Sequence, residues 1–161
     1  MPHFNELTTI LNRHFKWNKA RMDCFVGMLI ALFYSKTSNL AQLAAAFPGT
    51  KKTDSNYRRI QRFLSSGQVI EFNKVAWFIM GLFGFLTTDY YLVFDRTNWQ
   101  WGKKNINILV LAVVYRGIAV PIYWLLLNKK GNSNSRERIA LLKRFISQFI
   151  YPVFAIFITA H

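Results

Sequence analysis

The sequence predicts an α+β fold in which a helical amino-terminal region precedes three antiparallel strands and a further helix. Up to about residue 84, apolar residues recur with the 3.6-residue period of a helix. Near Thr87 short runs of branched and aromatic residues replace that period, and it returns after Asn134. With 161 residues, 52% of them hydrophobic, the chain can bury the core of one ordinary domain or two small ones.

Five helices are expected in the first half. The residues expected to face the core are, helix by helix, Phe4, Leu7 and Leu11; Met22, Phe25, Val26, Leu29 and Phe33; Leu40, Leu43, Ala44 and Phe47; Tyr57, Ile60 and Leu64; and Phe72, Val75, Ala76, Ile79 and Phe83. Asn39, with Gln42 three residues later, predicts a capped start for the third helix. Thr53 or Asp54 is expected to cap the fourth.

Three strands and a helix are expected in the second half. The strands are Tyr90 to Phe94, Ile106 to Tyr115 and Ile118 to Leu127, and Arg116 and Gly117 supply the turn between the last two. Because proline cannot donate a hydrogen bond to a sheet, Pro121 predicts an edge strand or a bulge. Asn134 and Glu137 are expected to cap the final helix. The change of period predicts two domains, residues 1–86 and 87–161.

The charge balance predicts a polyanionic partner. Twenty-one Lys and Arg against seven Asp and Glu give a net charge of +14, which suits nucleic acid or an anionic membrane surface. Five basic residues and a single acid, Asp54, lie in the segment that follows the third helix and its Pro-Gly turn and forms the fourth helix. The five basic residues are Lys51, Lys52, Arg58, Arg59 and Arg62. A short helix, a turn and a second helix with an outward basic face resemble the helix-turn-helix arrangement that reads DNA, although such a face can also be merely solvated.

Other features narrow the class of protein. With Cys24 as the sole cysteine, neither an intrachain disulfide nor a cysteine zinc site can form, so a reducing cytoplasm is the simplest location. The amino terminus does not have the pattern of a signal peptide. A small basic membrane protein is the less favoured alternative, because no apolar run reaches the roughly 18 to 20 residues of a spanning helix.

Asp95 is the candidate metal ligand. It follows an expected apolar strand directly and is itself followed by Arg96, Thr97 and Asn98. A carboxylate at the open end of a buried strand is held rigidly, which suits metal binding. A turn-forming aspartate is the alternative interpretation.

Two stretches, with the Leu- and Val-rich strand after them, resemble the first catalytic motif of bacterial insertion-sequence transposases of the DDE type. They are Tyr-Tyr-Leu-Val-Phe-Asp-Arg-Thr-Asn-Trp at 90–99 and Trp-Gly-Lys-Lys-Asn-Ile-Asn at 101–107. The resemblance extends from about Phe4 to Gln148 and includes Gly-Asn-Ser-Asn-Ser-Arg-Glu-Arg at 131–138. It implies a ribonuclease-H-like core whose first strand ends in Asp95, a catalytic residue that binds Mg²⁺ or Mn²⁺. It also implies a helical domain that binds the terminal inverted repeats of double-stranded DNA, metal-dependent DNA cleavage, and strand transfer from the freed 3′ hydroxyl. Lys103 and Lys104 would then contact phosphate.

The sequence departs from that family in its carboxylates. The family needs a second aspartate after a fourth strand and a glutamate on a later helix, but Glu137 is the sole acid after Asp95. The segment Val153 to Ala160 is the expected fourth strand of a partial, truncated core. We therefore expect an inactive transposase fragment that binds insertion-sequence ends, alone, as a homodimer or with intact transposase. A non-catalytic DNA-binding protein that competes with intact transposase is the alternative.

Overall fold

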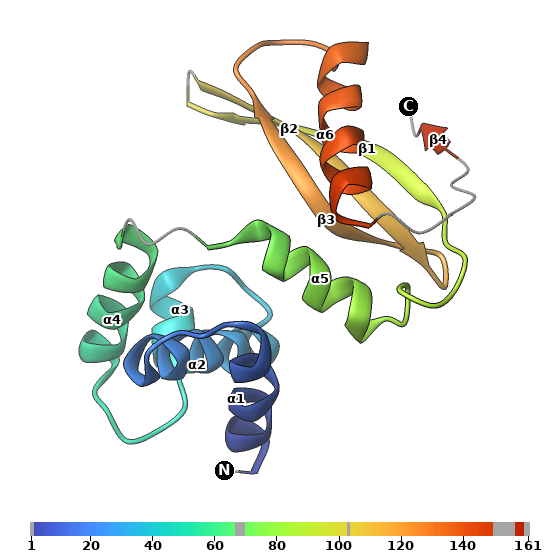
Figure 1. Cartoon of the computed structure of the whole chain (residues 1–161). Helices are drawn as coiled ribbons and strands as arrows, with labels where there is room; N and C mark the ends of the chain where they lie inside the picture. The colour runs from blue at the N-terminus through green and yellow to red at the C-terminus, as the bar shows by residue number, and fades with distance from the viewer. Residues whose placement is uncertain (1, 67–69, 103, 150–156, 160–161) are drawn as a thin grey trace. The chain divides into compact units, whose positions relative to one another are not determined.

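The computed structural model describes residues 2–66, 70–102, 104–149 and 157–159 (Figure 1). Within these ranges the chain forms six helices and four strands, so the predicted α+β class is confirmed. The elements are α1 (Pro2–His14), α2 (Lys19–Ser35), α3 (Leu40–Ala45), α4 (Thr53–Ser65), α5 (Phe72–Leu82), β1 (Leu92–Trp101), β2 (Lys104–Tyr115), β3 (Ile118–Leu127), α6 (Ser135–Gln148) and β4 (Phe157–Thr159). No helix in the described ranges is long and apolar enough to cross a bilayer.

The chain divides into two compact units, an amino-terminal unit of residues 1–69 and a carboxy-terminal unit of residues 70–161. This division precedes α5, whereas the change of sequence period suggested a boundary between residues 86 and 87. The reason is packing, because Ala76 and Met80 of α5 belong to the same buried cluster as Leu92 and Leu111 of the sheet. By its contacts α5 is therefore part of the carboxy-terminal unit.

The core of the amino-terminal unit gathers around α2. One buried cluster in this core joins α2, α3, the segment after α3, and α4: Cys24, Ala31, Leu43, Ala44, Phe47 and Ile60. Asn18 caps α2 by accepting a hydrogen bond from the backbone N–H of Arg21 at 2.9 Å. The expected cap of α3 is confirmed, since Asn39 accepts from the N–H groups of Ala41 and Gln42.

The sheet has the strand order β3-β2-β1-β4. β1 pairs antiparallel with β2, β2 pairs antiparallel with β3, and β4 pairs in parallel with β1 (Figure 1). Phe157–Thr159 lies within the range expected for a fourth strand, while 153–156 and 160 are outside the described residues. The sheet is therefore an antiparallel meander extended by one short parallel strand.

Two local predictions about the sheet are confirmed. Arg116 and Gly117 connect β2 and β3, and both have positive φ angles, of 49° and 81°, as a two-residue hairpin turn requires. The pairing shifts between Leu111 and Ala112, where Ala112 faces Pro121 and Leu111 faces Tyr123, so Pro121 lies at a bulge in an edge strand.

The predicted end of the first strand is wrong. β1 does not end at Phe94 but continues to Trp101, because it pairs with β2 along its whole length. Asp95 therefore lies inside a strand, opposite Val110, instead of at the strand's open end.

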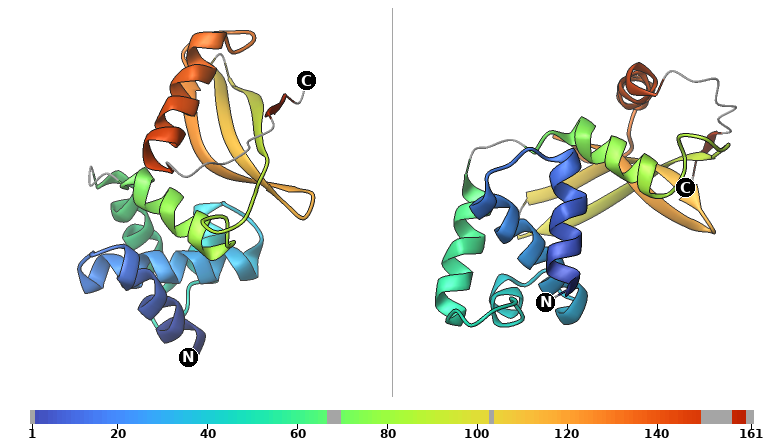
Figure 2. Two further views of the ribbon diagram at one scale, coloured as in Figure 1. Left: turned by 45° about the vertical axis from the view of Figure 1, so that its right-hand side comes forward. Right: turned by 60° about the horizontal axis from the view of Figure 1, so that its bottom comes forward.

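Helix α6 covers one face of the sheet, beside β2 and β3 (Figure 2). Its residues Leu141 and Phe145 are buried in one cluster with Leu92 and Phe94 of β1. Helix α5 packs along β3, where the Phe72 ring meets the Trp124 ring at 4.8 Å between centroids. The second face of the sheet carries the alternate residues of each strand, among them Asp95.

Two helical glycines give a matched test of packing. A Cβ added at Gly27 in α2 would lie 2.3 Å from the buried ring of Phe47, whereas one added at Gly81 in α5 would be 3.8 Å from Leu86 Cδ1. We expect Gly27→Ala to lower the free energy of unfolding by about 1–3 kcal/mol through overpacking. Gly81→Ala should leave it unchanged or raise it by up to about 1 kcal/mol, because alanine favours a helix. Urea unfolding followed by circular dichroism measures both, and equal stabilities would contradict the packing described here.

Candidate nucleic-acid interface

Four exposed basic side chains lie on α4 and just before it. Lys51 and Lys52 directly precede the helix, and Arg58 and Arg62 lie one turn apart along it. The Nε of Arg62 donates to the backbone oxygen of Arg58 at 3.3 Å, so the Arg62 side chain runs back along the helix. Asp54 is the single acid between residues 51 and 66. Because neighbouring charges of one sign add, this basic face of α4 carries a positive potential.

Helix α4 begins without the expected side-chain cap. Lys52 is the residue before its first turn and no side chain caps there, so the prediction that Thr53 or Asp54 caps the helix is wrong. Asp54 lies instead in the first turn. Its negative charge there favours the helix, because the backbone N–H groups at a helix start form the positive end of the dipole.

A buried asparagine fixes α4 to the segment before it. Asn56 is 3% exposed, and its Nδ2 donates to the backbone oxygens of Ala44 and Lys51, each at 3.4 Å. These hydrogen bonds join α4 to the end of α3 and to the residue beside the lysine pair. The direction of α4 is thereby coupled to the position of Lys51.

The buried face of α4 differs from the predicted one. Ile60 is fully buried and Tyr57 packs against the core as expected, but Leu64 is 57% exposed, and Asn56 and Phe63 also turn inward. The cause is α2, whose Phe25 ring stacks on the Phe63 ring at 5.9 Å between centroids. The helix is therefore rotated relative to the expected orientation.

This rotation changes the environment of Arg59. The sequence suggested that Arg59 points away from the core with its neighbours, but it is half-buried, and its guanidinium carbon lies 5.4 Å from the Phe47 ring centroid. Arg58 and Arg62 remain exposed as expected. The basic face of α4 therefore has an exposed row and a half-buried flank.

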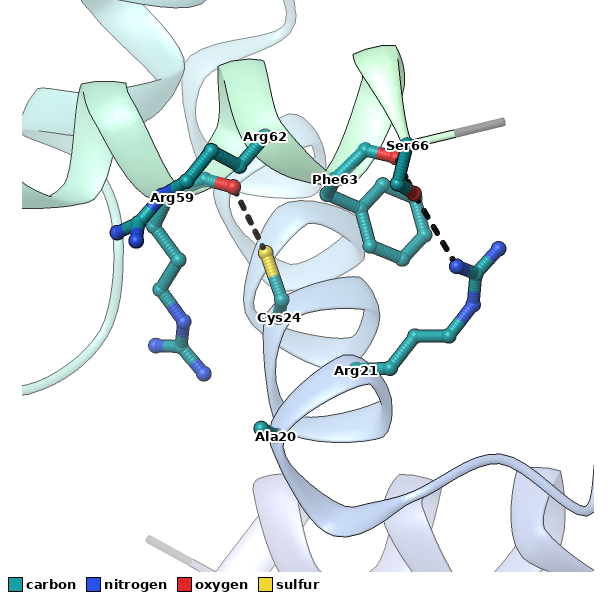
Figure 3. A pocket seen from close by; sticks show the side chains of 7 residues that line it. All are labelled: Ala20, Arg21, Cys24, Arg59, Arg62, Phe63 and Ser66. Carbon is teal, nitrogen blue, oxygen red and sulfur yellow. Dashed lines mark hydrogen bonds between the residues drawn. The ribbon is translucent and has the colours of Figure 1, made fainter. Parts of the chain in front are cut away.

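An open pocket of about 340 Å³ lies between α2 and α4 (Figure 3). The described residues that line it are Ala20, Arg21, Cys24, Arg59, Arg62, Phe63 and Ser66. Two of its arginines were candidates from the sequence, and Arg21 of α2 was not. A signal for Arg21 exists in its spacing from Cys24, three residues later, which places the two as neighbours on one side of the expected helix.

The floor of the pocket is an uncharged thiol. Cys24 is buried, and its Sγ–H donates to the backbone oxygen of Arg59 at 3.7 Å (Figure 3). Burial raises the pKa of the Cys24 thiol, and this outweighs the opposite effect of the Arg59 and Arg62 charges. At neutral pH the sulfur therefore carries no negative charge to offset the arginines.

Asp95 lies in the carboxy-terminal unit on the exposed side of β1. Its neighbour Phe94 is buried in the core, so alternation along the strand turns Asp95 to the other face. The backbone N–H of Arg96 donates to Asp95 Oδ1 at 2.7 Å. In the described residues β4 pairs with β1 as far as Thr159 and Phe94, one residue short of Asp95.

A polar network holds the loop between β3 and α6. Asn107 of β2 is 1% exposed, and its Nδ2 donates to the backbone oxygens of Lys129 at 3.2 Å and Gly131 at 2.9 Å. Arg96 Nη1 also donates to the Gly131 oxygen, at 3.0 Å. The motif residues at 96 and 107 thus position the 131–138 stretch, the third part of the resemblance.

Glu137 caps α6, as predicted. Its Oε2 accepts from the backbone N–H of Asn134 at 2.7 Å, and Asn134 Oδ1 accepts from the backbone N–H of Glu137 at 2.9 Å. Glu137 Oε1 also pairs with Lys129 Nζ at 2.8 Å. One carboxylate oxygen therefore caps the start of α6, and the other holds Lys129 of the preceding loop.

The described residues do not form a two-metal centre. They contain no group of three or more His, Cys, Asp or Glu side chains that could hold a metal ion, and Asp95 supplies a single carboxylate. Two divalent ions about 4 Å apart place four positive charges in one site, which a single carboxylate does not balance. The donor set of the described residues thus does not fit the metal pair that the resemblance implies.

Of the two lysines expected to contact phosphate, the structure describes one, at the β1–β2 hairpin. Lys104 begins β2 and pairs with Trp101, while Lys103 is outside the described residues. Lys51, Lys52, Arg58, Arg59 and Arg62 belong to the amino-terminal unit, and Asp95 and Lys104 to the carboxy-terminal unit. The candidate DNA-binding residues on and before α4 and the candidate residues Asp95 and Lys104 therefore lie in different units.

The Glu137 capping box gives a prediction about pH. The hydrogen bond from Lys129, and then that from the Asn134 backbone, lower the pKa of Glu137 below its ordinary value. A lowered folded-state pKa stabilises the fold above the unfolded pKa, and this stability is lost as the pH falls through the folded one. We expect Glu137→Gln to lower the melting temperature at neutral pH, with the difference from the native chain shrinking in acid. Glu6→Gln, in an exposed position of α1, is the control, and a pH-independent difference would contradict the prediction.

Comparison with known proteins gives no match to a family model, to a curated protein or to a solved structure. The resemblance to DDE transposases thus rests on the residues of its motifs alone. What that resemblance implies about fold family, DNA binding and metal ions stays a prediction.

Proposed function

We propose that this chain binds double-stranded DNA through the basic face of α4 and is the amino-terminal part of a DDE-type transposase. The observation that carries the proposal is the exposed row of Lys51, Lys52, Arg58 and Arg62, with one acid among them, in a chain of net charge +14. Lys and Arg that neutralise DNA phosphates release bound counterions, which is the main source of sequence-independent affinity. The terminal inverted repeats of an insertion sequence are the DNA that the resemblance implies.

The arrangement of α3 and α4 partly resembles a helix-turn-helix. A short helix is followed by a longer one with a basic outer face, as in that motif. The connection spans residues 46–52, however, and is longer than the 3–4-residue turn typical of the motif. Phosphate contacts are therefore better supported than a base-reading helix in the major groove.

The topology of the carboxy-terminal unit supports the transposase part of the proposal. The unit has three antiparallel strands, a helix and a fourth strand parallel to the first, which is the order of elements expected at the start of a ribonuclease-H-like core. Asp95 lies on the strand that would carry the first metal-binding aspartate. Arg96 and Asn107 both donate hydrogen bonds to the backbone oxygen of Gly131, and these bonds connect the three stretches of the resemblance.

We further propose that the chain alone binds DNA without cleaving it. Glu137 is engaged as a helix cap, and the sequence contains no other acid after Asp95. A chain that binds DNA but lacks a complete set of catalytic carboxylates would occupy the DNA sites without cutting them. It would therefore compete with intact transposase for these sites. Pairing with a second copy or with intact transposase would serve the same role.

The first test measures how DNA affinity depends on salt. We expect Arg58→Ala with Arg62→Ala to lower the slope of log affinity against log salt by up to about 1.8, at roughly 0.9 for each lost phosphate contact. The matched control is Arg136→Ala with Lys143→Ala, which removes two exposed charges from α6. Fluorescence anisotropy with a labelled duplex gives both slopes. Equal slopes for the native chain and the α4 variant would show that Arg58 and Arg62 of α4 do not contact DNA phosphates.

The second test concerns catalysis. We expect the purified chain neither to nick nor to join supercoiled plasmid DNA with Mg²⁺ or Mn²⁺, because one carboxylate does not balance two divalent ions. Gel electrophoresis of the plasmid measures this directly. Metal-dependent nicking that disappears in Asp95→Asn would overturn the expectation and require carboxylates from a second subunit.

A further inference from the structure

Helix α1 packs against α2, and the two helices leave an open groove between them (Figure 1). This α1–α2 groove has a volume of about 440 Å³. The described residues that line it come from the first half of α1 and the second half of α2: His3, Leu7, Leu29, Ile30, Phe33 and Tyr34. None of these is Lys, Arg, Asp or Glu, so the groove suits an apolar side chain and does not suit a phosphate.

Two aromatic side chains at the rim of the groove are largely exposed. Phe33 is 80% exposed and Tyr34 is 70% exposed, both in the last turn of α2. Their rings meet edge to face with the centroids 5.9 Å apart. This contact restricts both rings before any partner arrives, which lowers the entropy cost of association. A groove and two exposed rings thus lie next to each other on one surface.

The surface around the groove has little charge. Residues 2–12 and 24–35 contain one charged side chain, that of Glu6, in a chain with 21 basic and 7 acidic residues. Two copies of a chain with a net charge of +14 repel each other, and the repulsion is weakest where the facing surfaces carry neither Lys nor Arg. A polyanion finds no basic side chain in these two ranges. The charge pattern therefore favours a second copy of the chain over nucleic acid at this surface.

A groove beside an exposed ring is also self-complementary. In a dimer with two-fold symmetry the same patch meets itself, so Phe33 of each copy can enter the groove of the other. Burying an aromatic side chain removes about 150–250 Å² from water, so Phe33 and Tyr34 supply about 300–500 Å² of the roughly 800 Å² that each partner in a stable complex buries. Ile10, which is 39% exposed and lies on the same face of α1 as His3 and Leu7, adds to this area.

We propose that the α1–α2 groove is a self-association surface on which a second copy of this chain docks, with Phe33 of each copy in the groove of the other. A symmetric pairing of this kind closes at two copies, so the expected species is a dimer and not a longer assembly. The inference goes beyond DNA binding and does not depend on it, because the basic face of α4 contributes no residue to the groove.

Sedimentation equilibrium of the full chain, freed of nucleic acid by nuclease, measures the dissociation constant of the dimer. We expect a monomer–dimer equilibrium, and we expect Phe33→Ser with Tyr34→Ser to weaken it by about 100-fold or more, because a symmetric interface loses each ring twice. Both positions are largely exposed, so the circular dichroism of the variant should match that of the native chain. The matched control is Leu64→Ser with Leu82→Ser, which removes two exposed apolar side chains from α4 and α5 and should leave the constant unchanged.

The dependence on salt separates this association from DNA binding. Salt screens the repulsion between two copies and should tighten the dimer, whereas it weakens the affinity for DNA. A dimer that weakens as the salt concentration rises would overturn the proposal, because it would show that charges and not the apolar groove hold the copies together.

A photo-crosslinking side chain locates the contact. Phe33→p-benzoylphenylalanine should give a covalent dimer on irradiation. Mass spectrometry of a mixture of isotope-labelled and unlabelled chains should then place the cross-link on Leu7, Leu29 or Ile30 of the other copy. Leu64→p-benzoylphenylalanine is the control, and it should give no covalent dimer.

Three further results would overturn the proposal. They are a native chain that stays monomeric at every concentration, equal dissociation constants for the native chain and the variant at Phe33 and Tyr34, and a cross-link confined to elements other than α1 and α2. Each of them leaves DNA binding by α4 intact, since that function is tested by the salt slope of Arg58→Ala with Arg62→Ala. An unchanged salt slope in that variant would, in turn, leave the dimer intact.

Discussion

The absence of a side chain at Gly27 is the constraint on which the amino-terminal unit depends. A Cβ at this position would overlap the Phe47 ring at 2.3 Å, so the ring can lie against α2 only because residue 27 is glycine. Phe47 lies two residues after the end of α3 and is buried in the same cluster as Ile60 of α4. Its ring also lies under the Arg59 guanidinium. One close approach of helix and ring thus places α3, α4 and the half-buried arginine together.

Much of the fold could be predicted because its signals are local. The helical period identified the helices, and Asn39 and the Asn134–Glu137 pair marked two of their starts through hydrogen bonds made within three residues. The turn at Arg116 and Gly117 and the bulge at Pro121 follow from backbone conformations that these residues prefer. In each case the determining atoms lie within a few residues of one another.

The rest depends on contacts between distant segments. Both Phe63 and Leu64 are apolar, and α2, through Phe25, determines which of them turns inward. The polar Asn56 is buried because two backbone oxygens of the preceding segment accept its hydrogen bonds, which a pattern of apolar residues does not reveal. The pocket between α2 and α4 shows the same contrast. Arg59 and Arg62 could be predicted as candidates from the pattern of one helix, whereas Arg21 lines the same pocket only because α2 packs against α4.

The sheet topology also implies an order of folding. β1, β2 and β3 follow one another along the chain and pair as consecutive hairpins, so their contacts are short-range and form quickly. In the chain, β2, β3 and α6 lie between β1 and β4. Closing this long loop costs more entropy, and the described residues form three pairs in return. During synthesis, the meander with α5 against it can therefore assemble while β4 is still inside the ribosome, so the parallel pairing follows the antiparallel pairing.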